Sequence, residues 1–147
     1  MSKPISKPII VSAAEAVQLQ SSPISRDWVT QGNPETRSKE LTRSADKTCY
    51  AMVWECTAGV FNWHYNKDEG LVVISGEAFI SHGETPERRI GPGDFVFFPA
   101  GTSAKWRVPQ FIKKVAYLRH TMPRAAGYGV LAWNGLLRLL KGSGGGL

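Results

Sequence analysis

Short apolar runs separated by turn-forming residues fill the stretch from Thr48 to Arg119, and this pattern constrains the fold more than any other feature. The runs are rich in β-branched and aromatic residues, which is typical of β-strands. In the first run, alternation places Tyr50, Met52 and Trp54 on one face. The successive runs are CYAMVWEC, VFNWHY, GLVVIS, EAFIS, DFVFF, SAKWRV and FIKKVAYLR. Because no helical pattern interrupts them, the sequence predicts an all-β sandwich or barrel.

Glycine and proline mark the boundaries between these runs. Ser75–Glu77 predicts a tight hairpin turn between two strands. Gly91–Asp94 and Pro99–Gly101 predict β-turns, because proline fixes φ and glycine readily adopts a positive φ. We therefore expect short strands joined by tight turns.

The segments on either side of the predicted barrel have a different character. Residues 1–46 are polar and contain four prolines, which predicts an extended N-terminal arm. Within it, Ser12 and Glu15 form a capping box that predicts a short helix, and the segment from Arg37 to Arg43 is expected to be an edge strand. Residues 47–122 are the predicted barrel.

Residues 123–147 form a C-terminal segment in which leucines, a tryptophan and basic residues alternate in a way that predicts a short amphipathic helix. A flexible glycine-rich tail is expected to follow that helix. The apolar face of the helix has three candidate partners: the barrel, a second subunit or a membrane surface.

Length and composition indicate one globular domain without a membrane-spanning helix. The chain has 147 residues, of which 42% are hydrophobic, and its apolar runs are too short to span a bilayer. Ile9–Val11 is too short for the core of a signal peptide, so we predict a cytoplasmic location. Cys49 and Cys56 are seven residues apart in one predicted strand, which places them on opposite faces as reduced thiols.

The net charge of +6 is concentrated in the C-terminal half. From Phe95 onward the chain has no acidic residue and eight basic ones. Such an excess attracts nucleic acid or an anionic surface, or forms an ordinary solvated face. Nucleic-acid binding is disfavoured because the sequence contains no helix-turn-helix, zinc-finger or basic-zipper pattern.

Two segments, Gly59–Ile80 and Ile90–Val108, each contain a motif of residues at fixed spacing. The residues that define this spacing are His64, Glu69 and Gly76 in the first segment and Gly93, Pro99 and Gly101 in the second. With these motifs the sequence resembles the cupin superfamily, and more narrowly the family that includes ureidoglycine aminohydrolase and the ethanolamine-utilisation cupins. The resemblance implies a double-stranded β-helix, which is the jelly-roll barrel of the cupins.

The resemblance also implies where a metal would bind. In cupins, three histidines and a glutamate face the barrel interior and hold a divalent ion such as manganese, iron, nickel or zinc. Asn62 and His64 stand at the first two histidine positions of this spacing, and Ala104 stands at the third. His64 and Glu69 are therefore the predicted metal ligands and the catalytic candidates, while Asn62 offers a weaker amide oxygen.

Strand alternation predicts that positions 62, 64, 104 and 106 all face the barrel interior, and that Trp63 faces the other way. Arg107 and Lys114 have two interpretations, as binding residues for a carboxylate or as surface or interface charges, and the second is the expected one. The predicted ligand-binding residues are Asn62, Trp106, Phe97 and Val73.

Three functions are compatible with the sequence. The first is binding of a small molecule in the barrel, with or without a divalent metal. The second, implied by the resemblance, is a manganese-dependent hydrolase acting on a small nitrogen compound, so whether the protein is an enzyme stays open. The third is a non-catalytic interaction or regulatory role for the basic C-terminal half. Exposed sheet edges are a hazard in such folds, and the long arm can cover an edge of its own barrel or of a neighbouring copy, so we also expect a homodimer.

Overall fold

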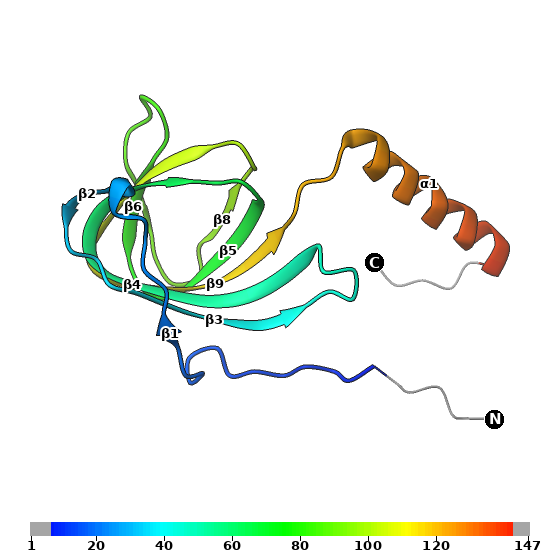
Figure 1. Ribbon diagram of the computed structural model, residues 1–147, viewed down its shortest axis with the longest axis horizontal. Helices are drawn as coiled ribbons and strands as arrows, with labels where there is room; N and C mark the ends of the chain where they lie inside the picture. The colour runs from blue at the N-terminus through cyan, green and yellow to red at the C-terminus, as the bar shows by residue number, and fades with distance from the viewer. Residues whose placement is uncertain (1–6, 143–147) are drawn as a thin grey trace.

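A computed structural model describes residues 7–142 and shows a β-barrel with one helix beside it (Figure 1). The helical elements are the 3-10 helix η1 (Arg26–Trp28) and the α-helix α1 (Arg124–Lys141). The strands are β1 (Gln20–Ser21), β2 (Val29–Gly32), β3 (Thr36–Arg43), β4 (Cys49–His64), β5 (Asp68–Gly76), β6 (Ala78–Ser81), β7 (Arg88–Ile90), β8 (Phe95–Phe98) and β9 (Ser103–Arg119). The predicted all-β jelly-roll barrel is confirmed.

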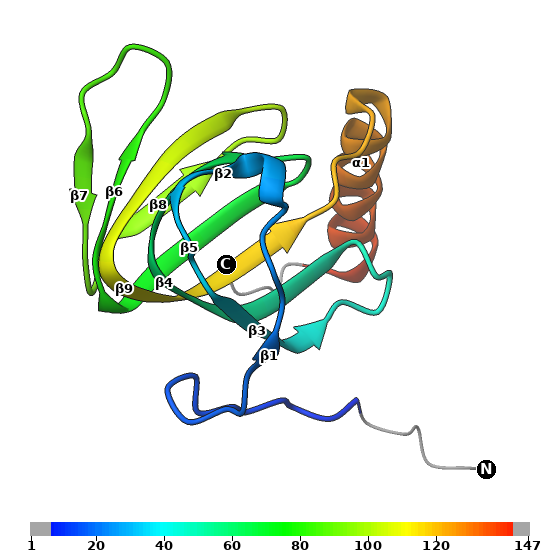
Figure 2. The same cartoon turned by 60° about the vertical axis from the view of Figure 1, so that its left-hand side comes forward.

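Two long antiparallel strands, β4 and β9, run through both layers of the barrel (Figure 2). The first half of β4 and the second half of β9 lie at the centre of one layer, whose strand order is β1-β3-β4-β9-β5-β8. Their other halves belong to the second layer, in which β2 pairs with β4 and β6 pairs with β9 and β7. The barrel closes because both strands bend between the layers.

The bend coincides with a register shift between Thr57 and Gly59 in β4. On the opposite strand, Pro109 lies within the shifted stretch, where a missing backbone N–H interrupts no ladder bond. A Cβ atom at Gly59 would lie 2.7 Å from the ring of Pro34, so only glycine lets that loop approach the bend. The runs CYAMVWEC and VFNWHY were predicted as separate strands but form the single strand β4. In the same way, SAKWRV and FIKKVAYLR form the single strand β9.

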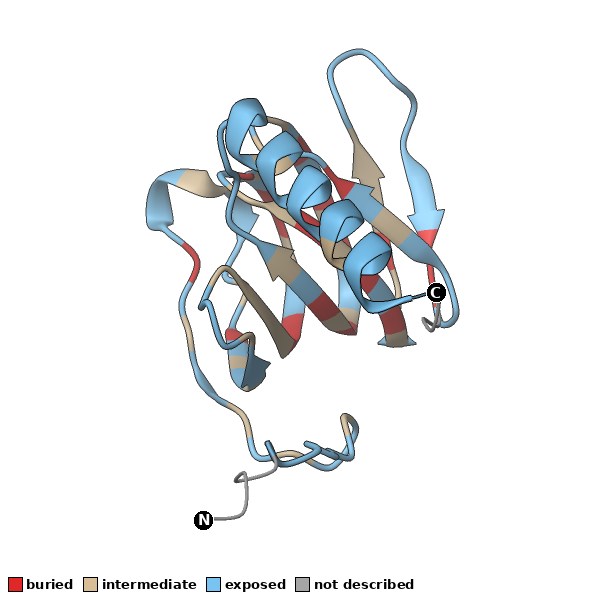
Figure 3. Ribbon diagram, turned by 90° about the vertical axis from the view of Figure 1, so that its right-hand side faces the viewer, coloured by how far each residue is buried: buried red, intermediate tan, exposed pale blue. Residues whose placement is uncertain are grey.

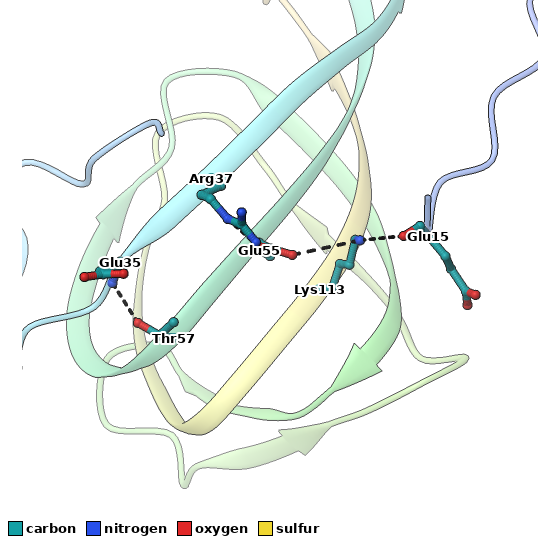
Figure 4. Close-up of polar contacts among 6 residues, drawn as sticks. All are labelled: Glu15, Glu35, Arg37, Glu55, Thr57 and Lys113. Atoms are coloured by element: carbon teal, nitrogen blue, oxygen red, sulfur yellow. Dashed lines mark hydrogen bonds and ion pairs between the residues drawn. The ribbon is translucent and has the colours of Figure 1, made fainter. Parts of the chain in front are cut away.

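The arm covers its own barrel. β1 pairs with the outer edge of β3, and β2 pairs with β4. The outer face beneath the arm carries Glu55, which accepts a hydrogen bond of 2.7 Å from Arg37 Nε (Figure 4). Lys113 Nζ lies 3.9 Å from the same carboxylate and donates a hydrogen bond of 3.1 Å to the carbonyl of Glu15. This contact ties the arm to the barrel.

The short helix predicted from the Ser12–Glu15 capping box does not form at these residues. The backbone there makes a single turn, in which Ala16 and Val17 donate to the carbonyl of Ala13. None of residues 11–19 is buried against the barrel, and an isolated short helix is unstable in water. The short helix of the arm is instead η1. The strand predicted at Arg37–Arg43 is confirmed as β3, but it is not the edge strand, because β1 pairs with its outer side.

The two predicted β-turns are confirmed. Gly93 and Gly101 have positive φ angles, and each turn is closed by a backbone hydrogen bond. The predicted hairpin at Ser75–Glu77 is wrong, because β5 and β6 do not pair with each other. Both strands pair in succession with β9, and Gly76 lets the chain pass from one layer to the other.

The predicted C-terminal helix is confirmed as α1, which has eighteen residues. The predicted glycine-rich tail at residues 143–147 lies outside the described residues. No helix in the described part of the chain is long and apolar enough to cross a membrane.

The two cysteines lie on opposite faces of β4 as predicted, and both are free thiols. Cys56 is fully buried, and this burial raises the pKa of its thiol to about 12, although the nearby Lys114 ammonium acts in the opposite direction. We expect iodoacetamide at pH 8 to modify Cys49 in the folded protein while leaving Cys56 unmodified, because the thiolate is the reactive species. Mass spectrometry of peptides from native and urea-unfolded samples would measure this, and equal labelling of both cysteines in the native sample would contradict it.

Candidate functional site

A pocket of about 260 Å³ opens at the mouth of the barrel, between the inner faces of β3, β4, β5 and β9 and the arm. Three tryptophans and two tyrosines line its wall, and the arm contributes Ser22 and Trp28 to its rim. The Ser22 hydroxyl is buried without a hydrogen-bond partner among the described residues. The full lining is Ser22, Trp28, Ser38, Tyr50, Met52, Trp54, Trp63, His64, Tyr65, Asn66, Lys67, Glu69, Lys114 and Leu118.

A buried ion pair lies in this pocket. Lys114 Nζ, from β9, donates a hydrogen bond of 2.6 Å to Glu69 Oε1, from β5. The residues are 5% and 4% exposed, so both charges are almost fully removed from water. Each charge depends on the other, since an unpaired buried charge is costly.

Tryptophan rings surround the ammonium of Lys114. Its nitrogen lies 4.7 Å from the ring centre of Trp54, 5.1 Å from that of Trp106 and 6.0 Å from that of Trp63. Ring faces carry negative charge density and attract a cation most strongly where water is excluded. The expectation that Lys114 is a surface charge is therefore wrong, whereas Arg107 is a surface charge and pairs with Glu87.

Stacked aromatic rings in the core of the barrel pack against the tryptophans that surround Lys114. The rings of Phe61 and Trp106 are stacked with centres 6.1 Å apart, and those of Tyr65 and Phe98 are stacked at 4.3 Å. Trp106 Nε1 donates a hydrogen bond of 3.0 Å to the Tyr65 hydroxyl. Burial strongly raises the pKa of Tyr65, so its phenol stays protonated.

The predicted inward orientation of Asn62 and His64 is wrong, because both side chains are exposed. β4 pairs Phe61 with Trp106 and Trp63 with Ala104, and directly paired residues share a face of the sheet. Since Trp106 and Ala104 face inward as predicted, the inward residues of β4 after the register shift are the odd-numbered ones, whereas before the shift they are the even-numbered Tyr50, Met52 and Trp54. Trp63 therefore faces the pocket, contrary to expectation.

The other predicted site residues are dispersed. His64 lies at the pocket rim, where its Nδ1 is 2.7 Å from the Ser103 hydroxyl and its ring meets Trp28 edge-on. Val73 is 1% exposed and belongs to the core, while Phe97 faces outward and is 53% exposed. Of the predicted residues, only His64 and Glu69 line the pocket, and their partners are Ser103 and Lys114 rather than each other.

The residues around Glu69 do not fit a divalent metal. The two inward-facing residues that come before Glu69 in the chain are Trp63 and Tyr65. Neither has an imidazole to offer a metal. The Lys114 ammonium already holds the carboxylate that would bind the ion. Across residues 7–142, no group of three or more histidine, cysteine, aspartate or glutamate side chains is placed to hold a metal.

Solved structures confirm the fold. A cupin 2 conserved barrel domain protein from Rhodopseudomonas palustris superposes with a TM-score of 0.58 at 14% identity, covering 79% of this chain and 83% of that one. A protein of unknown function from Pseudomonas syringae gives a TM-score of 0.65 at 22% identity over 71% of this chain. The match covers 45% of the Pseudomonas protein, so this chain corresponds to less than half of that protein's length.

An ethanolamine utilization protein Q from Salmonella typhimurium gives a TM-score of 0.51 at 23% identity, covering 58% of this chain and 69% of that one. No protein among the curated sequences matches this chain. The family model for the EutQ-like cupin domain matches residues 43–116, which is just over half of the chain and includes the Glu69–Lys114 pair. The chain therefore belongs to the EutQ-like cupin domain family.

Proposed function

We propose that the pocket binds a small organic molecule with a flat apolar body and an acidic group, without a metal. The observation that supports this most is the buried Lys114–Glu69 pair beneath walls of tryptophan and tyrosine. Ligand pockets in proteins are mostly apolar and contain a few fixed polar groups, which matches this lining.

The charge of the ligand follows from the charges of the lining. Lys67 and Lys114 contribute two positive charges, and Glu69 contributes one negative charge. A carboxylate in the pocket would accept hydrogen bonds from ammonium groups, whereas a cation would have to compete with Lys114 for Glu69. The excess of one positive charge therefore favours an anionic ligand.

The walls favour a planar ligand body. Trp28, Trp54 and Trp63 present rings to the pocket at steep angles to one another, and flat groups pack well against such surfaces. The unpartnered Ser22 hydroxyl adds a polar group beside these rings, where a ligand oxygen or nitrogen would satisfy it.

A matched set of probes tests the proposal: benzoate, benzamide and benzylamine, each titrated by calorimetry. We expect benzoate to bind most tightly. Replacing Trp63 by leucine is expected to weaken binding by at least about tenfold, because a wall of the pocket is lost. Trp133→Leu is the control, since Trp133 lies outside the pocket and is 61% exposed. Equal affinity for all three probes, or loss of binding in the control alone, would contradict the proposal.

The same protein, titrated with manganese, iron, nickel or zinc salts, tests the metal expectation. We expect no stabilisation that depends on Glu69, because the Lys114 ammonium occupies the position beside its carboxylate. Metal-dependent stabilisation that disappears in Glu69→Gln would favour metal binding instead.

A further inference from the structure

α1 is exposed along its whole length. None of its residues is buried, and Figure 3 shows the helix as an almost continuous exposed surface. Its large apolar side chains are exposed to an extent that is unusual for a protein surface. These side chains are Tyr128 (70%), Val130 (47%), Leu131 (68%), Trp133 (61%), Leu136 (47%), Leu139 (84%) and Leu140 (73%).

The helix lacks the features that would stabilise it alone in water. It contains Gly127, Gly129 and Gly135, and glycine is a poor helix former. Its N-cap is Pro123, which makes no side-chain cap hydrogen bond, and its first turn has no acidic residue. Helices in proteins are stabilised mainly by packing of an apolar face, so this helix needs an apolar partner beyond the barrel.

The two sides of α1 differ in chemistry. Arg124, Leu131 and Arg138 are spaced by seven residues and therefore lie in one row along the helix. Trp133, Leu136 and Leu140 lie on the opposite side. The apolar arc extends over about 200°, which is wider than the stripe of about 100° with which a helix typically packs on a protein core.

From these observations we propose that α1 lies in the surface of an anionic lipid bilayer and attaches the barrel to it. Charge complementarity selects this occupant, because α1 contains three basic residues and no acidic one, whereas four other basic residues after Asp94 are paired with carboxylates of the barrel. The helix itself carries Arg124, Arg138 and Lys141 beside a wide face with leucine and tryptophan. That combination is typical of helices that lie in the membrane interface.

Co-sedimentation of the full chain with vesicles tests this proposal. Vesicles of phosphatidylcholine with 30% phosphatidylglycerol are compared with vesicles of phosphatidylcholine alone, both at low salt. Each basic side chain contributes about fivefold to binding of an anionic surface, so three predict a preference on the order of 100-fold. We also expect the preference to diminish at 0.5 M salt.

A pair of leucine variants separates lipid insertion from general charge attraction. Leu140→Gln removes a leucine from the centre of the apolar side, and we expect it to weaken binding by at least about tenfold. Leu131→Gln is the matched control, because Leu131 is similarly exposed but lies between the two arginines. We expect it to bind within about threefold of the unchanged chain.

Three results would overturn the proposal. The first is absence of binding to the anionic vesicles at low salt. The second is equal loss of binding in both leucine variants. The third is a stable dimer in light scattering that Leu140→Gln converts to a monomer while vesicle binding is unchanged, which would assign the apolar face to a second copy of the chain.

Discussion

Replacing Lys114 by methionine is expected to lower the free energy of unfolding by about 3–5 kcal/mol, because Glu69 would be left as an unpaired buried charge. Methionine keeps most of the volume of the lysine stem, so the loss reports on the charge rather than on a cavity. The measurement is urea unfolding followed by far-ultraviolet circular dichroism, which reports mainly on the backbone of the strands.

Two further variants identify the cause. Lys113→Met removes the neighbouring lysine, which lies on the outer face and is 3.9 Å from Glu55. We expect it to cost less than about 1 kcal/mol, because Arg37 still pairs with Glu55. The double replacement of Lys114 by methionine and Glu69 by leucine removes both buried charges, so we expect it to restore much of the lost stability. If Lys114→Met and Lys113→Met were equally destabilising, the pair would not be a buried structural interaction.

The orientation of the candidate site could have been predicted from the sequence by giving alternation more weight than motif spacing. In the run VFNWHY, the aromatic residues Phe61, Trp63 and Tyr65 alternate, and a strand directs such a set to one face. Placing His64 inward requires all three aromatic residues to face away from the core. A shift of one residue reverses every side chain of a strand, so the error placed Asn62 and His64 inside the barrel, although both face outward.

Lys114 carries a similar signal in the sequence. It stands between Ile112 and Ala116 in the alternating series of β9, and both neighbours are buried. A lysine at an apolar position of a strand is buried only if a partner neutralises it, and Glu69 is an inward acidic residue of the adjacent strand. The pairing of β5 with β9 could not be derived from local patterns, because it depends on where the chain changes layers.

The hairpin predicted at Gly76 shows the same limit. A glycine between two short apolar runs is typical of both a hairpin turn and a crossing between layers, and the local sequence does not distinguish them. The structure resolves the ambiguity through the contact of Gly76 with β9, which is distant in sequence.

That contact predicts a large effect for Gly76→Ala. Gly76 has a φ of +73°, and a Cβ atom built there would lie 2.1 Å from the carbonyl oxygen of Phe111. The same oxygen accepts a hydrogen bond of 2.9 Å from the backbone N–H of Glu77, so it is held in place. A side chain must therefore move β5 away from β9 at the point where the chain crosses between layers. We expect a loss of at least about 3 kcal/mol in the free energy of unfolding, from strain and disrupted packing together.

Gly101→Ala isolates the contribution of backbone conformation. Gly101 has a φ of +86°, but a Cβ atom there would meet nothing within 4 Å, so its replacement adds conformational strain without a collision. We expect a cost of about 1–2 kcal/mol for this variant, measured by the same urea unfolding. A clear excess for Gly76→Ala would show that the close approach to β9 requires glycine. Equal losses in the two variants would mean that β5 and β9 move apart easily at this point. The chain would then not need a residue without a side chain at position 76 to cross between the layers.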